Sequence, residues 1–266
     1  MPSLLDREAA ATASHRADCI KRDSKALGVS SCLSLTPASN TGLIPQNGFE
    51  TSIDTVTVVF RKIATGKGAM DIKALLESTF SEKIDFDVNR PTFMMRHWDG
   101  SSSASLRGTM LHWKAPKEYG YGALRVHLPG KALAGVPSSD ITAFFKYMHE
   151  VYQADCTRLD IAADDYGVRD YLLDVEAAAL QKNYVGVRSH RVITSGGLGA
   201  PDGKTIYFGS KASDMQLRVY DKAVESNGVK QCIRWELQLR RCKAYAVFEK
   251  LLSLPSEEPG DLSSLI

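Results

Sequence analysis

The chain has 266 residues, of which 44% are hydrophobic and 24% are charged, and this composition is ordinary for a globular protein. Its formal net charge of +2 excludes a strongly basic chain, so any nucleic-acid site must be a local patch. The N-terminus lacks a secretory signal pattern, and no uninterrupted apolar run is long enough to span a bilayer. We therefore expect a cytoplasmic protein with no membrane partner.

Residues 1–49 are rich in small and polar side chains, and we expect a disordered or loosely helical extension there. A folded domain is expected over residues 50–255, followed by a polar tail at residues 256–266. The domain opens with Ser52–Arg61, a β-branched run typical of a buried strand, in which Asp54 is interpreted as a charge at the strand edge. Met70–Phe80 follows, with apolar residues at helical spacing.

The middle of the chain has the pattern of a β-meander. Strands are expected at Pro91–Trp98, Ser105–Lys114 and Tyr121–Leu128, with loops that contain Gly100, Ser101–Ser103 and Pro116. In the third strand, Arg125 and His127 alternate with leucine and valine, so one face of the strand is polar. A helix is expected to begin near Ser138, and its apolar stripe is assigned to the core.

Charged residues alternate with apolar residues in the next predicted strand, Thr157–Asp165. Arg158, Asp160 and Asp164 would share one face, and the apolar residues would face a core. Ala162 lies between the two carboxylates, where its small side chain leaves room for a ligand or an ion. A helix at Asp174–Lys182 and a strand at Arg188–Thr194 are expected to follow.

A glycine-rich stretch, Ser195–Thr205, resembles a phosphate-binding loop but lacks two of its features. The position where that motif needs a glycine is Leu198, and a β-rich segment rather than a helix follows Thr205. We therefore expect a hairpin loop there.

Thr205–Lys222 has the pattern of two short extended segments joined by a turn. In the second segment, Arg218, Tyr220 and Lys222 would point to the same face. A tyrosine hydroxyl between two cations suits a nucleophile that attacks a phosphate, because the cations favour the phenolate and also bind the phosphate.

The last predicted strand, Cys232–Arg240, places Arg234, Glu236 and Gln238 opposite its apolar residues, and a helix at Lys243–Leu254 follows it. Several strands thus have one polar face, and the helices between them can cover the other face. This pattern predicts an α+β fold with a largely antiparallel sheet and an exposed polar face. If Asp160, Tyr220 and Glu236 lie on neighbouring strands, they share that face, and an oxygen-rich site of this kind suits Mg²⁺ or Mn²⁺.

Three segments, RLDIAADD, TIYFGSKASDMQLRVYDKAVE and RWELQLR, together carry a family resemblance. In this order they resemble the Rep-trans rolling-circle replication initiators of plasmids, filamentous phages and integrative elements, and SIDTVTVVF fits the opening strand of that family. The resemblance implies a fold similar to the ferredoxin-like core of HUH endonucleases, in which helices cover one face of the sheet. It also implies an enzyme that nicks and rejoins one strand of origin DNA through a 5′-phosphotyrosine intermediate, with a divalent metal. A host helicase and a homodimer are the further partners implied.

The resemblance also assigns roles to residues. Tyr220 in RVYDK matches the nucleophile, flanked by Arg218 and Lys222, while Asp160 in RLDIA and Glu236 in RWELQ match acidic positions expected to hold the metal. The chain lacks the His-hydrophobic-His motif of typical HUH enzymes, and His127 is the candidate for the missing nitrogen ligand. The basic residues expected to contact DNA are Arg158, Lys211 and Arg234.

Alternative interpretations of the same residues stay open. Asp160 can pair with Arg158, Glu236 can bridge to Arg218, and His127 can be structural. Asp164 is interpreted as a cap of the turn that follows it. At the level of function, the alternative is a non-catalytic origin-binding protein, or a degenerate initiator that regulates replication.

Overall fold

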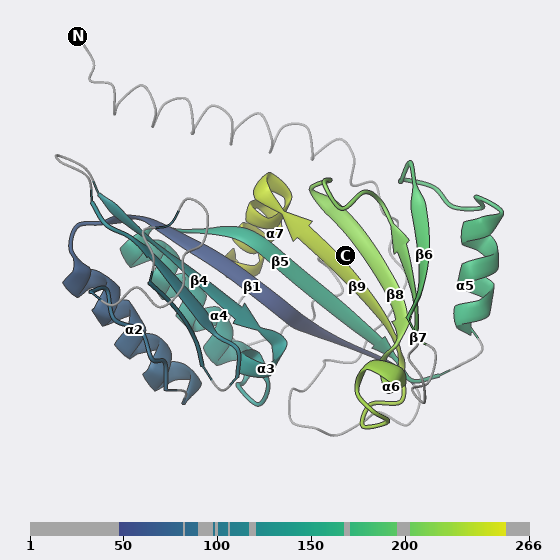
Figure 1. Ribbon diagram of the computed structural model, residues 1–266, viewed down its shortest axis with the longest axis horizontal. Helices are drawn as coiled ribbons and strands as arrows, with labels where there is room; N and C mark the ends of the chain where they lie inside the picture. The colour runs from purple at the N-terminus through teal and green to yellow at the C-terminus, as the bar shows by residue number, and fades with distance from the viewer. Residues whose placement is uncertain are drawn as a thin grey trace, which may run out of the picture.

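The fold is described for residues 48–81, 83–89, 98, 101–105, 107–116, 121–167, 171–195 and 203–253 of a computed structural model (Figure 1). The expected extension as far as residue 47, the tail at 256–266 and most of the expected strand at 91–98 lie outside these residues. Phe49, which the sequence analysis assigned to the extension, is the first residue of β1.

A single antiparallel sheet runs through the described part of the chain. Its strand order is β2-β3-β4-β1-β5-β9-β8-β7-β6, and each neighbouring pair is antiparallel. The strands are β1 (Phe49–Ile63), β2 (Ser101–Ala104), β3 (Met110–Lys114), β4 (Gly122–Pro129), β5 (Ala154–Asp165), β6 (His190–Ser195), β7 (Gly203–Phe208), β8 (Met215–Asp221) and β9 (Ile233–Arg240).

Helices cover one face of this sheet. The helices are α2 (Gly66–Phe80), α3 (Gly130–Leu133), α4 (Ser138–Tyr152), α5 (Tyr171–Leu180), α6 (Lys222–Glu225) and α7 (Arg241–Ser253). α2, α4 and α7 pack against the centre of the sheet around β1 and β5, and α5 packs against β7 and β8 (Figure 1). The predicted arrangement, with helices over one face, is therefore present.

The main core lies between the central strands and α2, α4 and α7. Val56 pairs with Leu128 on one side and with Leu159 on the other, so one apolar row crosses three strands. The Phe145 ring of α4 meets the Phe248 ring of α7 edge to face, with their centroids 5.5 Å apart. Alternation of β-branched and leucine side chains along the strands places this row on a single face, where the helices bury it.

Most elements expected from the sequence are present with shifted ends. The hairpin of β7 and β8 turns at Gly209–Asp214, and β6 pairs with β7 in the hairpin predicted in place of a phosphate-binding loop. Residues 101–103, expected in a loop from the sequence, belong to β2. Serine has little intrinsic strand preference, so the open hydrogen-bonding edge of β3 determines the conformation of this segment.

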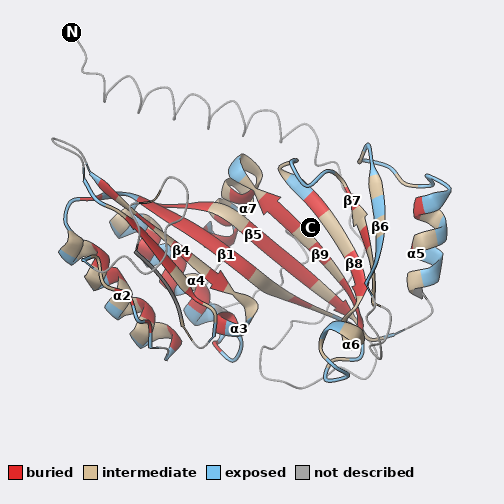
Figure 2. Cartoon of the chain, in the orientation of Figure 1, coloured by how far each residue is buried: buried red, intermediate tan, exposed pale blue. Residues whose placement is uncertain are grey.

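The polar face is more closed than the sequence analysis predicted. Figure 2 shows buried residues along β1, β5 and β9, and they include charged ones. Asp160 and Glu236 are 0% exposed, although both lie on the face away from the helices. The side chains of Arg158 and Arg218, which are 35% and 30% exposed, pair with these carboxylates and shield them from solvent.

Candidate active site

Asp54 reaches the polar face through a bulge in β1. Ile53 pairs with Ile161, whereas Thr55 pairs with Asp160, so one extra residue of β1 lies between two consecutive pairs. Strict alternation would put Asp54 on the apolar face. The extra residue shifts the alternation and brings the Asp54 carboxylate next to Asp160.

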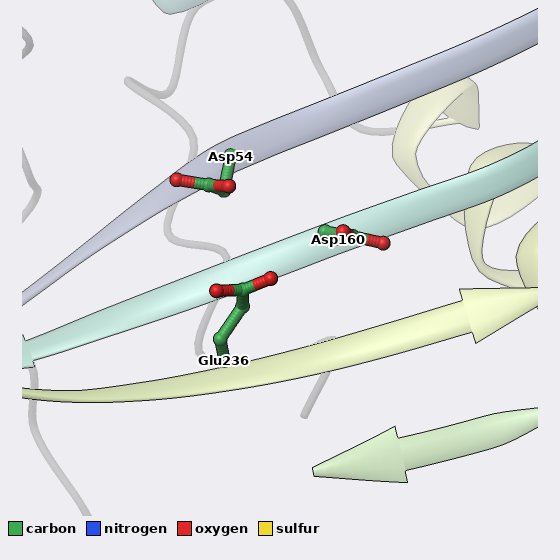
Figure 3. A group of neighbouring side chains, drawn as sticks. All are labelled: Asp54, Asp160 and Glu236. Carbon is green, nitrogen blue, oxygen red and sulfur yellow. The ribbon is translucent and has the colours of Figure 1, made fainter. Parts of the chain in front are cut away.

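Three carboxylates from neighbouring strands converge on the polar face (Figure 3). Asp54 comes from β1, Asp160 from β5 and Glu236 from β9, and one oxygen of each lies within 4.8 Å of the others. Glu236 extends over β5 toward Asp54, above its small cross-strand partner Ala162. A set of oxygen ligands alone fits a hard divalent ion such as Mg²⁺ or Mn²⁺. We call these three residues the acidic triad.

Arginines pair with the two triad residues that the sequence analysis had identified. Arg158 binds Asp160 through two nitrogens, with Nη2 2.5 Å and Nε 3.0 Å from the carboxylate oxygens. Arg218 pairs with Oε1 of Glu236. Both ion pairs that the sequence left open as alternatives are therefore present, and a divalent ion at the triad would share its carboxylates with these guanidinium groups.

The Tyr220 hydroxyl lies beside the acidic triad. It donates a 3.1 Å hydrogen bond to Oε2 of Glu236, the oxygen that is not bonded to Arg218. Tyr220 is 8% exposed. Its strand partner is Arg234, so both residues lie on the polar face. The structure thus brings the predicted nucleophile within hydrogen-bond reach of the triad.

The phenol of Tyr220 is held in its protonated form. Burial raises its pKa above the ordinary value of 10.0, and the charge of Glu236 raises it further. This differs from the expectation that Arg218 and Lys222 favour the phenolate, because these cations are paired with Glu236 and Glu225 respectively. Burial also raises the pKa of Glu236 despite the opposing charge of Arg218.

Both predicted cations flank the tyrosine ring. The Arg218 guanidinium carbon lies 5.9 Å and the Lys222 Nζ 5.7 Å from the ring centroid. β8 ends at Asp221, so Lys222 is the first residue of α6 rather than a strand residue. Lys211 lies exposed in the turn between β7 and β8, and its contact with DNA stays a prediction.

His127 lies outside the acidic triad. Its Nδ1 is 2.9 Å from Oγ1 of Thr57, its cross-strand partner on β1. Burial and the charges of Arg125 and Arg158 lower its pKa to about 4. Asp54, and not His127, belongs to the group of ligand atoms that lie within 4.8 Å of one another, so this geometry lends no support to His127 as a ligand, and that role stays a prediction.

Arg234 was predicted to contact DNA, but its side chain contacts carboxylates of the protein. The residue is 4% exposed, and its side chain binds Asp164 through Nε at 2.5 Å and Nη2 at 2.7 Å. A third bond, from Nη1 to Oδ1 of Asp54, is 2.7 Å long. The guanidinium therefore bridges two carboxylates and holds Asp54 in place. Asp164 was expected to cap a turn, but its carboxylate instead forms ion pairs with both Arg234 and Lys230.

Replacing Asp164 with asparagine is expected to lower the free energy of unfolding at neutral pH by about 3 kcal/mol, because breaking a buried ion pair leaves Arg234 only partly compensated. Burial alone would raise the pKa of Asp164, but Arg234 and then Lys230 outweigh it and hold the pKa below 3.8. The contribution is present above the unfolded pKa and is lost as the pH falls through the lower folded pKa.

Urea denaturation at neutral and at acidic pH measures this effect. The difference between wild type and Asp164→Asn should shrink as the pH falls below 3.8. Asp214→Asn is the matched control, because Asp214 forms an exposed pair with Arg241 and its loss should cost less than about 1 kcal/mol. Equal stabilities of the two variants at neutral pH would contradict the buried bridge.

A cleft of about 890 Å³ opens next to the triad. Asp54 and Arg234 lie in its wall, together with other residues of the first half of β1 and residues of α3 and α6. Its basic side chains are Arg107, Lys131, Lys222, Lys230 and Arg234, and its acidic ones are Glu50, Asp54 and Glu225. Basic side chains thus outnumber acidic ones in this cleft, and Lys222 and Arg234 are paired with Glu225 and Asp54.

The part of the chain that carries Asp160, Tyr220 and Glu236 is similar to a known protein family. Residues 154–261 match Rep_trans, the replication initiation factor family. The resemblance to Rep-trans predicted from the sequence is confirmed over this segment, which we call the Rep_trans region. Asp54 and His127 lie before the Rep_trans region. No curated protein matches the chain at a significant level.

A solved structure of a rolling circle replication initiator protein from Geobacillus stearothermophilus is similar to this chain. The TM-score is 0.58 and the sequence identity 21%, and the match covers 79% of this chain and 82% of the other. Since it extends well beyond the Rep_trans region, it confirms the predicted α+β fold for most of the chain. No helix among the described residues is both long and apolar enough to cross a bilayer.

Proposed function

We propose that this protein initiates rolling-circle replication by cutting one strand of origin DNA with Tyr220 and later rejoining it. The observation that carries the proposal is the 3.1 Å hydrogen bond between the Tyr220 hydroxyl and Glu236, a member of the acidic triad. The match of residues 154–261 to replication initiation factors supports it, because three of the four residues at this centre lie in that segment.

The nicking step uses groups that are already in contact. The Tyr220 oxygen attacks the scissile phosphorus and its proton passes to Oε2 of Glu236. The bond from phosphorus to the 3′ oxygen breaks, and the 3′ oxygen takes up a proton from water and leaves as a hydroxyl. The 5′ phosphate is then joined to the tyrosine. This ester retains the reactivity of a phosphodiester bond, so a 3′ hydroxyl can reverse the step and reseal the strand without ATP.

The acidic triad supports Mg²⁺ or Mn²⁺ as the cofactor, which would be held by Asp54, Asp160 and Oε1 of Glu236, so that Oε2 stays available for the proton of Tyr220. Such an ion would polarise the scissile phosphate and offset the charge on the leaving 3′ oxygen. The partly exposed guanidinium groups of Arg158 and Arg218 lie at the rim of the triad, where they can bind the remaining phosphate oxygens.

The basic cleft beside Asp54 supports origin DNA as the partner. Lys131 is exposed in its wall, and Lys222 and Lys230 also line it. Basic side chains on one side of the triad can hold the phosphates of a single strand and guide it to Tyr220. A host helicase and a homodimer stay predictions.

One observation favours the second candidate, an initiator that binds origin DNA without cutting it. Tyr220 is 8% exposed and its hydroxyl is bonded to Glu236, as expected for a structural tyrosine. In that case the protein would bind origin DNA without metal-dependent cleavage.

A strand-cleavage assay distinguishes the two candidates. Single-stranded oligonucleotides from the protein's own replicon, labelled at the 3′ end, are incubated with the protein and Mn²⁺ and separated under denaturing conditions. Transfer of the label to the protein band is expected, and EDTA should prevent it. Binding without transfer on any such oligonucleotide would support the non-catalytic candidate.

A further inference from the structure

A second polar cluster lies on the same face of the sheet, beside the acidic triad. His127, Thr57 and Arg158 form one row across β4, β1 and β5, since Thr57 is the strand partner of both other residues. His112 of β3 pairs with Arg125 of β4 in the next row. Two strand spacings, about 10 Å, separate β4 from the strand of Asp160.

We propose that Arg125, His127 and Arg158, with His112 behind them, form a subsite for a phosphodiester group of the DNA strand that flanks the scissile phosphate. We call these four residues the His–Arg cluster. The inference rests on the proposed function only in taking a DNA strand as the ligand, and it assigns a binding role to residues outside the acidic triad.

Charge at the His–Arg cluster favours an anion over a metal ion. Burial and the charge of Arg158 lower the pKa of Arg125, and Arg158 also opposes protonation of His127. The charge of Asp160 favours protonation of His127, but this carboxylate is already bound by Arg158 and Gln238. A cation at His127 would be repelled by two guanidinium groups, whereas a phosphate would be attracted by both.

The imidazoles supply neutral hydrogen-bond donors. Burial and Arg125 hold the pKa of His112 and of His127 at about 4, so both rings are neutral near pH 7. The Thr57 hydroxyl contacts Nδ1 of His127 at 2.9 Å; when it donates there, Nε2 carries the proton and can donate to an anion.

His112 has unused hydrogen-bonding capacity. Its side chain is 2% exposed, and neither ring nitrogen has a hydrogen-bond partner in the part of the chain that the structure describes. Buried polar groups without partners are uncommon in native proteins and call for an explanation. A phosphate oxygen bound between Arg125 and His127 supplies an acceptor in this neighbourhood.

The location of the His–Arg cluster fits a strand that crosses the triad. The basic cleft opens beside Asp54, and the His–Arg cluster lies beside Asp160 on the side of β4. A single strand held at both places would pass over the acidic triad and present one phosphate to Tyr220. Arg158 is the member of the cluster that is bonded to Asp160, so it can bind the phosphate on either side.

The test is the salt dependence of binding to a fluorescein-labelled single-stranded thymidine oligonucleotide, measured by anisotropy. The full-length Tyr220→Phe protein is used throughout, so that no covalent adduct forms. Arg125→Gln should lower the slope of log K against log salt concentration by about 0.7, and lower the affinity about fivefold at 0.1 M salt. Arg125→Lys should keep the slope.

His127→Phe should weaken binding about tenfold with little change in slope, because a neutral donor is lost. Lys146→Gln is the matched control, since Lys146 is exposed on α4 and should leave both quantities unchanged. Mn²⁺ affinity, followed by electron paramagnetic resonance, should stay within about twofold of the parent in Arg125→Gln.

Two results would overturn the subsite: an Arg125→Gln variant with the parental salt slope, or a His127→Phe variant with the parental affinity. Because the assay measures binding alone, failure of strand cleavage in the wild type would leave a confirmed subsite intact. Conversely, cleavage at Tyr220 with unchanged slopes would remove the subsite and leave the proposed function standing.

Discussion

Replacing Tyr220 with phenylalanine is expected to lower strand cleavage by at least about 10³-fold, because the attacking oxygen is removed. DNA binding should stay close to that of wild type, since the phenol is bonded to Glu236 rather than exposed to a ligand. The lost hydrogen bond should lower the free energy of unfolding by only about 1 kcal/mol. Cleavage of a labelled oligonucleotide, anisotropy and urea denaturation measure these three quantities.

Tyr207→Phe is the matched control for this variant. Tyr207 lies on the neighbouring strand β7 as the strand partner of Arg218, and its ring stacks under Arg191. It has no bond to the acidic triad, so cleavage should be unchanged. If Tyr220→Phe kept its activity, the nucleophile would have to be another group. If it lost DNA binding as well as cleavage, Tyr220 would have a structural role instead.

Replacing Asp54 with asparagine is expected to have a second large effect, on Mn²⁺ affinity. This variant tests the residue that the bulge in β1 brings to the triad. Mn²⁺ affinity should fall by at least about 100-fold, because a triad carboxylate becomes a neutral amide of nearly the same shape. The amide oxygen can still accept the bond from Arg234, so the fold should be retained. Electron paramagnetic resonance of free and bound Mn²⁺ measures the affinity, and cleavage should fall with it.

Asp155→Asn is the control for the loss of one carboxylate from the sheet. Asp155 is buried on β5 but pairs with Arg61, away from the acidic triad. Its replacement should leave Mn²⁺ affinity unchanged. Wild-type Mn²⁺ affinity in Asp54→Asn would remove Asp54 from the ligand set and return the site to Asp160 and Glu236 with an unidentified third ligand.

The face of each strand was predictable where alternation is regular. Arg158, Asp160 and Asp164 on β5 share a face with Glu236 on β9, as expected from a period of two residues. Asp54 was missed because its position depends on a bulge in the pairing of β1 with β5. A bulge is a property of two paired strands, and the sequence of β1 alone read as an unbroken run.

Burial on the polar face could not be predicted from strand patterns. Alternation places Arg234 and Asp164 on that face, but it does not show that they are cross-strand partners. Once paired, Arg234 binds two carboxylates and is no longer available to DNA. The same limit applies to His127, whose polar face was predicted correctly, whereas its distance from Asp160 depends on the strand order β4-β1-β5.

The identity of the amino acid joined to DNA tests the central claim most directly. Wild-type protein is incubated with Mn²⁺ and an oligonucleotide that it cleaves, then digested with a protease and a nuclease, and its peptides are analysed by mass. The peptide that contains Tyr220 should carry a nucleotide attached through its 5′ phosphate. An adduct on Tyr207 or any other residue, or no adduct despite cleavage, would contradict a site built from Tyr220 and the acidic triad.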